Sequence, residues 1–261
     1  MLRNSFIHVP GIGRIRERWL WRHGYHSWND VLDGKKPEGW SEQTWEILIE
    51  HLNGSVLALE RRDGRFFERR FSASDSWRFY EEYCSKAAYL DIETSGYGKM
   101  HEQTVTVIGV YDGEKVHHFV HGINMHEFVP FIRGFNLLVT YNGKAFDLPM
   151  INSRYPEAGL ESIGHIDLRF VFAELGYKGG LKGIEKALGI ERPDGIAGMD
   201  GYAAVICWRR YIKGREKYLE TLLQYNAEDV KSLKPLAEMA CAMARERLTR
   251  VFRASGGEGI L

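Results

Sequence analysis

The chain has 261 residues, of which 44% are hydrophobic and 27% are charged, and this composition excludes long disordered stretches, collagen-like repeats and a coiled coil. Its 35 Lys and Arg residues balance its 35 Asp and Glu residues, so net charge indicates no polyanionic partner and any such site must be local. No stretch approaches the roughly 18 apolar residues of a membrane span. The cysteines Cys84, Cys207 and Cys241 form no C-x-x-C pair, which indicates a reducing compartment. Because the start MLRNSFIHVPGIGR also lacks the continuous apolar segment of a signal peptide, we expect a cytoplasmic protein with no membrane partner.

Residues 1–54 predict a small all-helical module. Pro10, Gly11 and Gly13 mark a turn between short helical segments, because Gly supplies positive φ and Pro fixes the approach to a turn. The following residues, 55–86, mix helix and loop signals, and we interpret them as a connector.

Strand patterns begin at Ala87. Short runs rich in β-branched and aromatic residues predict five strands, at 87–94, 103–113, 115–122, 136–143 and 165–172. The pair Asp112 and Gly113 predicts a hairpin between the second and third strands. Antiparallel strands followed by alternating strands and helices predict an α/β domain over 87–253, with a mixed five-stranded sheet flanked by helices, and then a tail at 254–261.

Two acids end the first predicted strand, in YLDIETSG. Side chains alternate along a strand, so Asp91 and Glu93 lie on one face. Such a pair arises about once by chance in a chain of this length. Buried carboxylates repel each other and lose their hydration, and a divalent cation would resolve that conflict. The alternative is a strand end that has emerged into solvent.

A third acid, Asp147, follows the fourth strand in YNGKAFDLP. On its own it fits a helix N-cap with Pro149 in the first turn, and Asn142 fits a turn residue. Both nevertheless lie where the sites of α/β sheets are assembled, at strand ends and helix starts.

A fourth acid lies in LLQYNAEDVKSL, where Tyr225 and Asp229 are four residues apart and share one helical face. Leu222 and Val230 indicate that this face packs against the sheet, whereas Glu228 points away from it. The alternative is a core tyrosine beside a surface acid.

The order of these motifs resembles the DEDD exonuclease superfamily, which has a ribonuclease H-like fold. YLDIETSG resembles its first motif, YNGKAFD its second and YNAEDV its third, with the tyrosine of the DEDDy branch. The run from FIHVPGIG through GLKGIEKALGI to YNAEDV further resembles the bacterial YprB-type group of ribonuclease H-like exonucleases. The resemblance covers about residues 87–235 and implies a 3′-5′ exonuclease that acts on single-stranded ends of DNA or RNA.

A carboxylate cluster without Cys or His favours Mg²⁺ or Mn²⁺ over zinc, because hard cations prefer oxygen ligands. The resemblance implies two ions, with Asp91 bridging both, Glu93 and Asp229 beside the attacking water, and Asp147 mainly on the second ion. An unperturbed phenol has a pKa of about 10. We therefore assign activation of the water to the metal ions and its alignment to Tyr225.

Candidate nucleic-acid contacts lie outside these motifs. The segment CWRRYIKGREKY mixes aromatic and basic residues, so Arg209, Arg210 and Lys213 are candidates for phosphate contacts, with a solvated helix end as the alternative. Lys182 at a helix start and Asn142 are further candidates, although surface lysines are usually solvated.

The opening VPGIGRIRERWLWRHG resembles a helix-hairpin-helix, whose backbone at Gly11 and Gly13 contacts phosphate. Glu17 stands where that motif has a small residue, so a packing role is an equal alternative. Asp167 fits either a helix N-cap or support of the site. His117 and His121 share a strand face without a third ligand, so we assign no metal site to them.

Two other functions stay open at this point. One is a nucleic-acid-binding adaptor with a weak or unused nuclease site, and the other is an RNase H-like structure-specific endonuclease. The sequence carries no signal for a particular protein partner.

Overall fold

The computed structural model describes residues 1–96, 99, 102–196 and 198–254. Its elements are, in chain order, η1 (Leu2–Asn4), α1 (Arg14–Arg22), α2 (Trp28–Leu32), α3 (Glu42–Glu60), α4 (Gly64–Glu68), η2 (Ser76–Phe79), α5 (Tyr80–Tyr83), η3 (Cys84–Lys86), β1 (Ala87–Thr94), β2 (Val105–Tyr111), β3 (Val116–Val120), η5 (Met125–Glu127), α6 (Phe128–Ile132), β4 (Leu137–Thr140), α7 (Asp147–Arg154), η6 (Pro156–Ala158), η7 (Leu160–Ser162), β5 (Gly164–Asp167), α8 (Leu168–Glu174), α9 (Leu181–Ala187), α10 (Gly201–Tyr211) and α11 (Lys217–Ala254). Of the predicted tail, Ala254 ends α11 and the rest lies outside the described residues.

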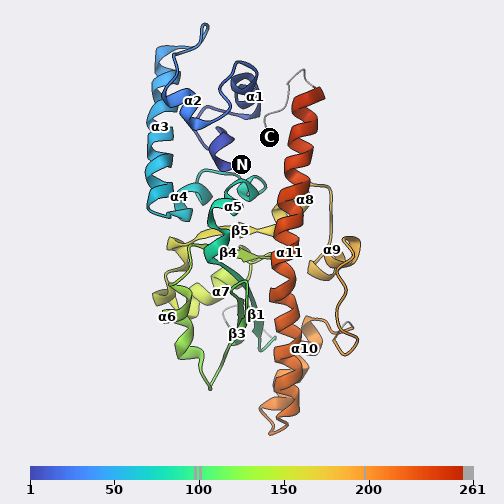
Figure 1. Cartoon of the computed structure of the whole chain (residues 1–261). Coiled ribbons are helices and arrows are strands. Elements are labelled where there is room, and N and C mark those ends of the chain that lie inside the picture. Colours follow the sequence, from blue (N-terminus) through green and yellow to red (C-terminus); the bar gives the residue numbers. More distant parts are fainter. Residues whose placement is uncertain (97–98, 100–101, 197, 255–261) are drawn as a thin grey trace.

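A mixed five-stranded sheet with the order β3-β2-β1-β4-β5 forms the middle of the molecule, as the sequence predicts (Figure 1). β1 pairs antiparallel with β2, and β2 pairs antiparallel with β3, whereas β1, β4 and β5 are parallel neighbours. The predicted hairpin is confirmed: the Asp112 N–H donates to the Lys115 carbonyl oxygen at 3.1 Å, and Gly113 has a φ of +100°.

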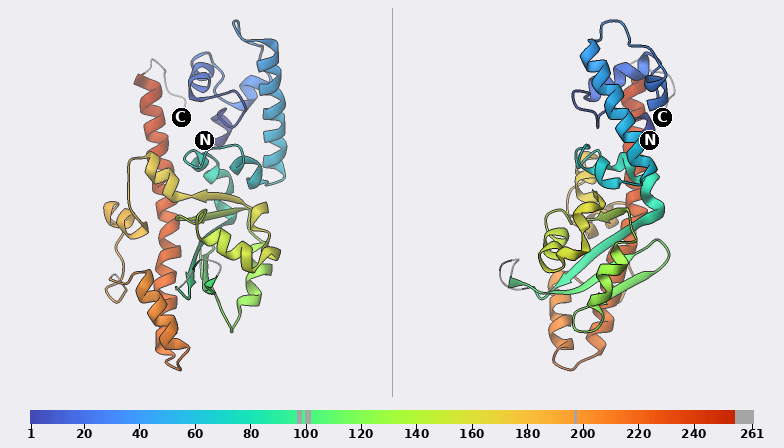
Figure 2. Two further views of the ribbon diagram at one scale, coloured as in Figure 1. Left: turned by 180° about the vertical axis from the view of Figure 1, so that it is seen from behind. Right: turned by 90° about the vertical axis from the view of Figure 1, so that its left-hand side faces the viewer.

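The side chains of β1 alternate between the two faces of the sheet. Leu90 and Ile92 belong to a core that they share with α6 and α7. Tyr89 belongs to the core on the opposite face, together with residues of α11. Asp91 and Glu93 have the parity of Tyr89, so both acids lie on the face that α11 crosses (Figure 2).

Close packing of α11 against the sheet depends on one glycine. Gly109 of β2 pairs with Asp91 in the register of the two strands. A Cβ atom at Gly109 would lie 1.8 Å from Oδ1 of Asn226 on α11, a distance that no side chain tolerates. The missing side chain therefore lets α11 approach the sheet beside Asp91.

The N-terminal helices pack on the same core as the sheet. Leu20 of α1, Val139 of β4 and Leu236 of α11 belong to one continuous cluster. At the far end of α11, the rings of Phe252 and Trp21 meet edge to face at 5.6 Å. α11 therefore runs along the length of the molecule, from α10 to the N-terminal helices (Figure 1).

The predicted boundary at residue 54 falls inside α3, which continues to Glu60. The last residue of the predicted module is Gly54, and a glycine inside a helix costs only about 1 kcal/mol relative to alanine. The Ser41 side chain caps this helix, and its buried face includes Trp45, Leu48 and Leu52. Packing of this face outweighs the low helix propensity of Gly54. The predicted connector itself contains α4, η2 and α5.

Glu17, the residue that departs from the helix-hairpin-helix pattern, is fully buried. Its Oε1 accepts hydrogen bonds from the Phe6 N–H at 2.7 Å, the Ser5 hydroxyl at 2.9 Å and Arg78 Nη1 at 3.0 Å. Within residues 1–22, only the 3-10 turn η1 precedes the turn at Gly11. The two-helix arrangement of that motif is therefore not formed, and Glu17 instead fixes the preceding loop.

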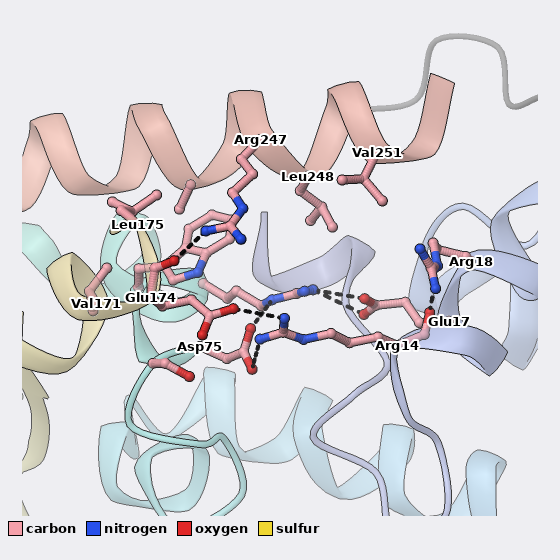
Figure 3. A pocket seen from close by; sticks show the side chains of 14 residues that line it. Arg14, Glu17, Arg18, Asp75, Val171, Glu174, Leu175, Arg247, Leu248 and Val251 are labelled. Carbon is pink, nitrogen blue, oxygen red and sulfur yellow. Dashed lines mark hydrogen bonds and ion pairs between the residues drawn. The ribbon is translucent and has the colours of Figure 1, made fainter. Parts of the chain in front are cut away.

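Further polar contacts join α1 to the sheet domain. Arg14 donates to Asp75 Oδ2 and to Glu174 Oε1, each at 3.0 Å, and Arg247 of α11 donates to the Glu174 carbonyl oxygen (Figure 3). These residues line a cavity of about 310 Å³ between α1, α8 and α11.

None of the helices in the described ranges combines the length and the apolar character of a membrane span.

We expect Glu17→Ala to lower the free energy of unfolding by about 3–5 kcal/mol, because it removes the carboxylate that accepts from Arg78 Nη1 and leaves this buried guanidinium with the longer ion pair to Asp75, at 3.5 Å. Urea unfolding monitored by circular dichroism measures this change. The matched control is Glu246→Ala, which breaks an exposed ion pair with Arg250 and is expected to cost less than about 1 kcal/mol. Equal effects of the two substitutions would contradict a stabilising role for Glu17.

Candidate functional site

Three of the four predicted acids meet at the end of β1. Asp91 and Glu93 of β1 and Asp229 of α11 each place a carboxylate oxygen within 4.8 Å of the others. Across the described ranges, no other group of three His, Cys, Asp or Glu side chains comes together in this way. The sheet and α11 thus bring acids from distant parts of the sequence into one cluster.

Asp147 lies beside this acid cluster, outside the 4.8 Å group. It is the first residue of α7, and its Oδ1 accepts a hydrogen bond from the Ile92 N–H of β1 at 3.1 Å. The N-cap alternative is therefore wrong, because Phe146 holds that position and the Asp147 carboxylate is turned toward the sheet.

Burial and mutual repulsion raise the pKa values of these acids. Burial first, and then the carboxylates of Asp229 and Asp147, raise the pKa of Asp91 and of Glu93 well above the usual range. Burial raises the pKa of Asp147 to about 7. A compact set of oxygen ligands, without Cys or His, fits a hard divalent cation. A cation bound there would favour the ionised form of these carboxyl groups.

Asn226 holds Asp91 in place. Its side-chain Nδ2 donates to Asp91 Oδ2 at 3.1 Å and to the Asp91 carbonyl oxygen at 3.4 Å. Asn226 is fully buried and lies one helical turn before Asp229. We did not predict it, although a polar residue three positions from Asp229, on a helix that packs on the sheet, was a usable signal.

Arg192 and Glu185 form a second unpredicted pair at the site. Arg192 donates two hydrogen bonds of 2.7 Å to the Glu185 carboxylate and one of 2.5 Å to Asp229 Oδ1. Arg192 lies between α9 and α10, and Glu185 lies on α9. Burial raises the pKa of Asp229, and the Arg192 guanidinium opposes that increase.

A cavity of about 960 Å³ opens beside the acid cluster and is lined by Asp91, Asp229, Tyr225, Lys182 and Asn142, among others. The Lys182 ammonium lies 4.7 Å from the centroid of the Tyr225 ring, and it is buried without a hydrogen-bond acceptor. Burial first, and then the carboxylate of Asp229, raise the pKa of Tyr225. The phenol therefore stays protonated at neutral pH.

Other candidate nucleic-acid contacts lie away from this cavity. Arg209, Arg210 and Lys213 lie at the end of α10 and just beyond it, where Arg210 donates to the Tyr218 hydroxyl at 2.7 Å. Gly11 and Gly13 lie beside α1, among the helices at the opposite end of α11 (Figure 1). None of these five residues lines the cavity.

Asp167 caps α8 and also orders the loop that carries Asn142. Its carboxylate accepts the N–H groups of Asn142 at 2.7 Å, Lys144 at 3.0 Å and Arg169 at 3.1 Å. The predicted N-cap is therefore confirmed, and the same carboxylate fixes the loop of Asn142, which lines the cavity. His117 pairs with Asp112 at 2.7 Å, and none of the described histidines joins a metal-ligand group.

Comparison with known proteins gives one family match. A model of the RNase_H superfamily matches residues 88–241, a range that includes all four acids. No curated protein matches the chain. Among solved structures, the family B DNA polymerase from the hyperthermophilic archaeon Pyrobaculum calidifontis is similar, with 20% sequence identity and a TM-score of 0.48; the match covers 59% of this chain and 24% of that chain.

The pKa of Asp147 predicts a pH-dependent effect of Asp147→Asn, which mimics the protonated carboxyl group. In the unfolded chain the pKa is about 3.9, so the folded protein binds this proton more tightly, and the resulting stability is lost as the pH rises through about 7. We expect the metal-free variant to melt close to wild type at about pH 3.5, where the carboxyl group is protonated in both states, and several degrees above it at about pH 8.

Thermal unfolding in the presence of EDTA measures this difference, and the comparison with wild type cancels the titration of groups remote from Asp147. A variant that is less stable than wild type at both pH values would contradict the raised pKa.

Proposed function

Because this chain belongs to the RNase_H superfamily, we propose that it is a divalent-metal-dependent nuclease that hydrolyses phosphodiester bonds. The observation that carries the proposal is the convergence of Asp91, Glu93 and Asp229 within 4.8 Å, with Asp147 beside them. The motif order and Tyr225 support the more specific assignment to the DEDDy branch and to its YprB-type group. The protein is then a 3′-5′ exonuclease for single-stranded ends.

The four acids are the residues that would hold two Mg²⁺ or Mn²⁺ ions. Bound ions supply Lewis acidity for the attack of water on phosphorus and for the departure of the 3′ oxygen. Asn226 fixes the Asp91 carboxylate through its 3.1 Å hydrogen bond, and the Ile92 N–H fixes Asp147. Ligands held in this way need little rearrangement when the metal binds.

Tyr225 is the proposed positioning residue for the attacking water. Its phenol lines the cavity beside Asp91 and Asp229, and its raised pKa makes it a hydrogen-bond donor rather than a base. Lys182 and Asn142 line the same cavity and are the proposed phosphate contacts. The volume of about 960 Å³ lies within the range of ligand sites, about 300–1,000 Å³. The contacts predicted for Arg209, Arg210, Lys213, Gly11 and Gly13 stay predictions.

Linear single-stranded DNA and RNA, labelled at the 5′ end, are expected to yield a ladder of products shortened from the 3′ end in the presence of Mn²⁺. Strands with a blocked 3′ end and circular strands are expected to remain intact. Asp91→Asn is expected to lower the rate by about 100-fold or more, because charge stabilisation at the reacting phosphate is lost.

Gel analysis of the products with time distinguishes the alternatives. Cleavage of the circles would identify an endonuclease. No cleavage of any substrate would favour the nucleic-acid-binding adaptor.

Tyr225→Phe is expected to slow hydrolysis by about 10- to 100-fold while leaving Mn²⁺ affinity within about twofold of wild type, because it removes only the hydroxyl that aligns the water. Single-turnover rates and calorimetric titration with Mn²⁺ measure the two quantities separately. A rate equal to that of wild type would exclude the hydroxyl from the reaction.

A further inference from the structure

Asp229 already has a cationic partner from its own chain. The Arg192 side chain is 6% exposed and the Asp229 side chain 8%, and Arg192 Nη2 donates to Asp229 Oδ1 at 2.5 Å. Glu185, 3% exposed, holds the same guanidinium from the other side through two hydrogen bonds of 2.7 Å. The three residues form a buried charge triad that ends in the acid cluster.

This contact puts Arg192 in competition with a metal ion. A guanidinium and a divalent cation are attracted by the same negative charge, and they repel each other at short range in a buried site. Lys182, another cation that lines the cavity, is not paired with an acid in this way, because its ammonium lies over the Tyr225 ring and has no carboxylate within hydrogen-bonding distance. Among the described contacts, Asp229 is thus the cluster acid that is paired with a cation.

Glu185 weakens the competition between Arg192 and a metal ion. Its negative charge neutralises Arg192 and so limits how strongly the guanidinium opposes a metal ion. Its bidentate contact also fixes the guanidinium, because a planar fork matched to a carboxylate has one preferred geometry.

We propose that Arg192 is a built-in counter-ion of Asp229, which stabilises the acid cluster in the metal-free protein and, balanced by Glu185, sets the divalent-cation concentration at which the site fills. This role rests on the proposed nuclease function, since it concerns the same acids. Arg192 is a positioning residue in this role. In the metal-free protein it neutralises part of the Asp229 charge.

Calorimetric titration of the full chain with Mn²⁺ tests the proposal. Arg192→Gln is expected to bind Mn²⁺ about tenfold more tightly than wild type, and Glu185→Gln about tenfold more weakly. Arg192→Lys keeps the charge and is expected to stay within about threefold of wild type. The matched control is Arg169→Gln, which removes a positive charge from the same cavity but not from an acid of the cluster, and is expected to change affinity less than twofold.

A second readout separates this role from simple orientation of a ligand. Without metal, Arg192→Gln is expected to melt below wild type, and with saturating Mn²⁺ its melting temperature is expected to rise more than that of wild type. A residue that only orients Asp229 would weaken metal binding by about 10- to 100-fold when lost. Weaker or unchanged Mn²⁺ affinity in Arg192→Gln would overturn the proposal.

Loss of one member of a buried ion pair can prevent folding, so the double variant Glu185→Gln with Arg192→Gln is measured as well. It keeps the net charge, and it is expected to bind Mn²⁺ more tightly than wild type because the removed cation was the closer charge. Asp91→Asn tests the site itself. If it leaves Mn²⁺ affinity unchanged, the proposed function is wrong; if it weakens binding while Arg192→Gln gives no gain, only the counter-ion role is wrong.

Discussion

Mutual repulsion among buried carboxylates is the constraint on which this structure depends. β1 carries Asp91 and Glu93 into a face of the sheet that α11 covers, and Asp229 arrives there from the helix. Each charge without a partner in such a place costs several kcal/mol. Two polar groups reduce that cost: the Asn226 amide donates a hydrogen bond to Asp91, and the Arg192 guanidinium donates one to Asp229. A bound divalent cation would neutralise the charge that these two groups leave.

The packing of the sheet serves the same arrangement. The bare backbone at Gly109 lets α11 lie close enough to β1 for Asn226 to reach Asp91. α7 begins at Asp147, next to the end of β1, so the second acidic motif arrives beside the first. The ends of parallel strands in an α/β sheet collect such loops and helix starts, and the acid cluster occupies this edge.

The periodicity of the sequence predicted much of this site. It could not predict the contacts between residues that are far apart in the sequence. Alternation along β1 placed Asp91 and Glu93 on one face, and the sheet with its Asp112 hairpin followed from strand patterns. We could predict that Asp229 meets β1 only from the order of the motifs, because the spacing of residues within a helix does not show which strand the helix covers. Arg192 was missed because it lies in a connection without periodicity, so nothing local paired it with Asp229 or Glu185.

The length of α11 has a mechanical consequence. The helix holds Asp229 near the sheet and Phe252 against Trp21, and Pro235 lies between them. A proline inside a helix removes one backbone hydrogen bond and makes that turn the easiest place to bend. A displacement of the N-terminal helices would therefore bend α11 most easily at Pro235, which lies between that end of the helix and Asp229.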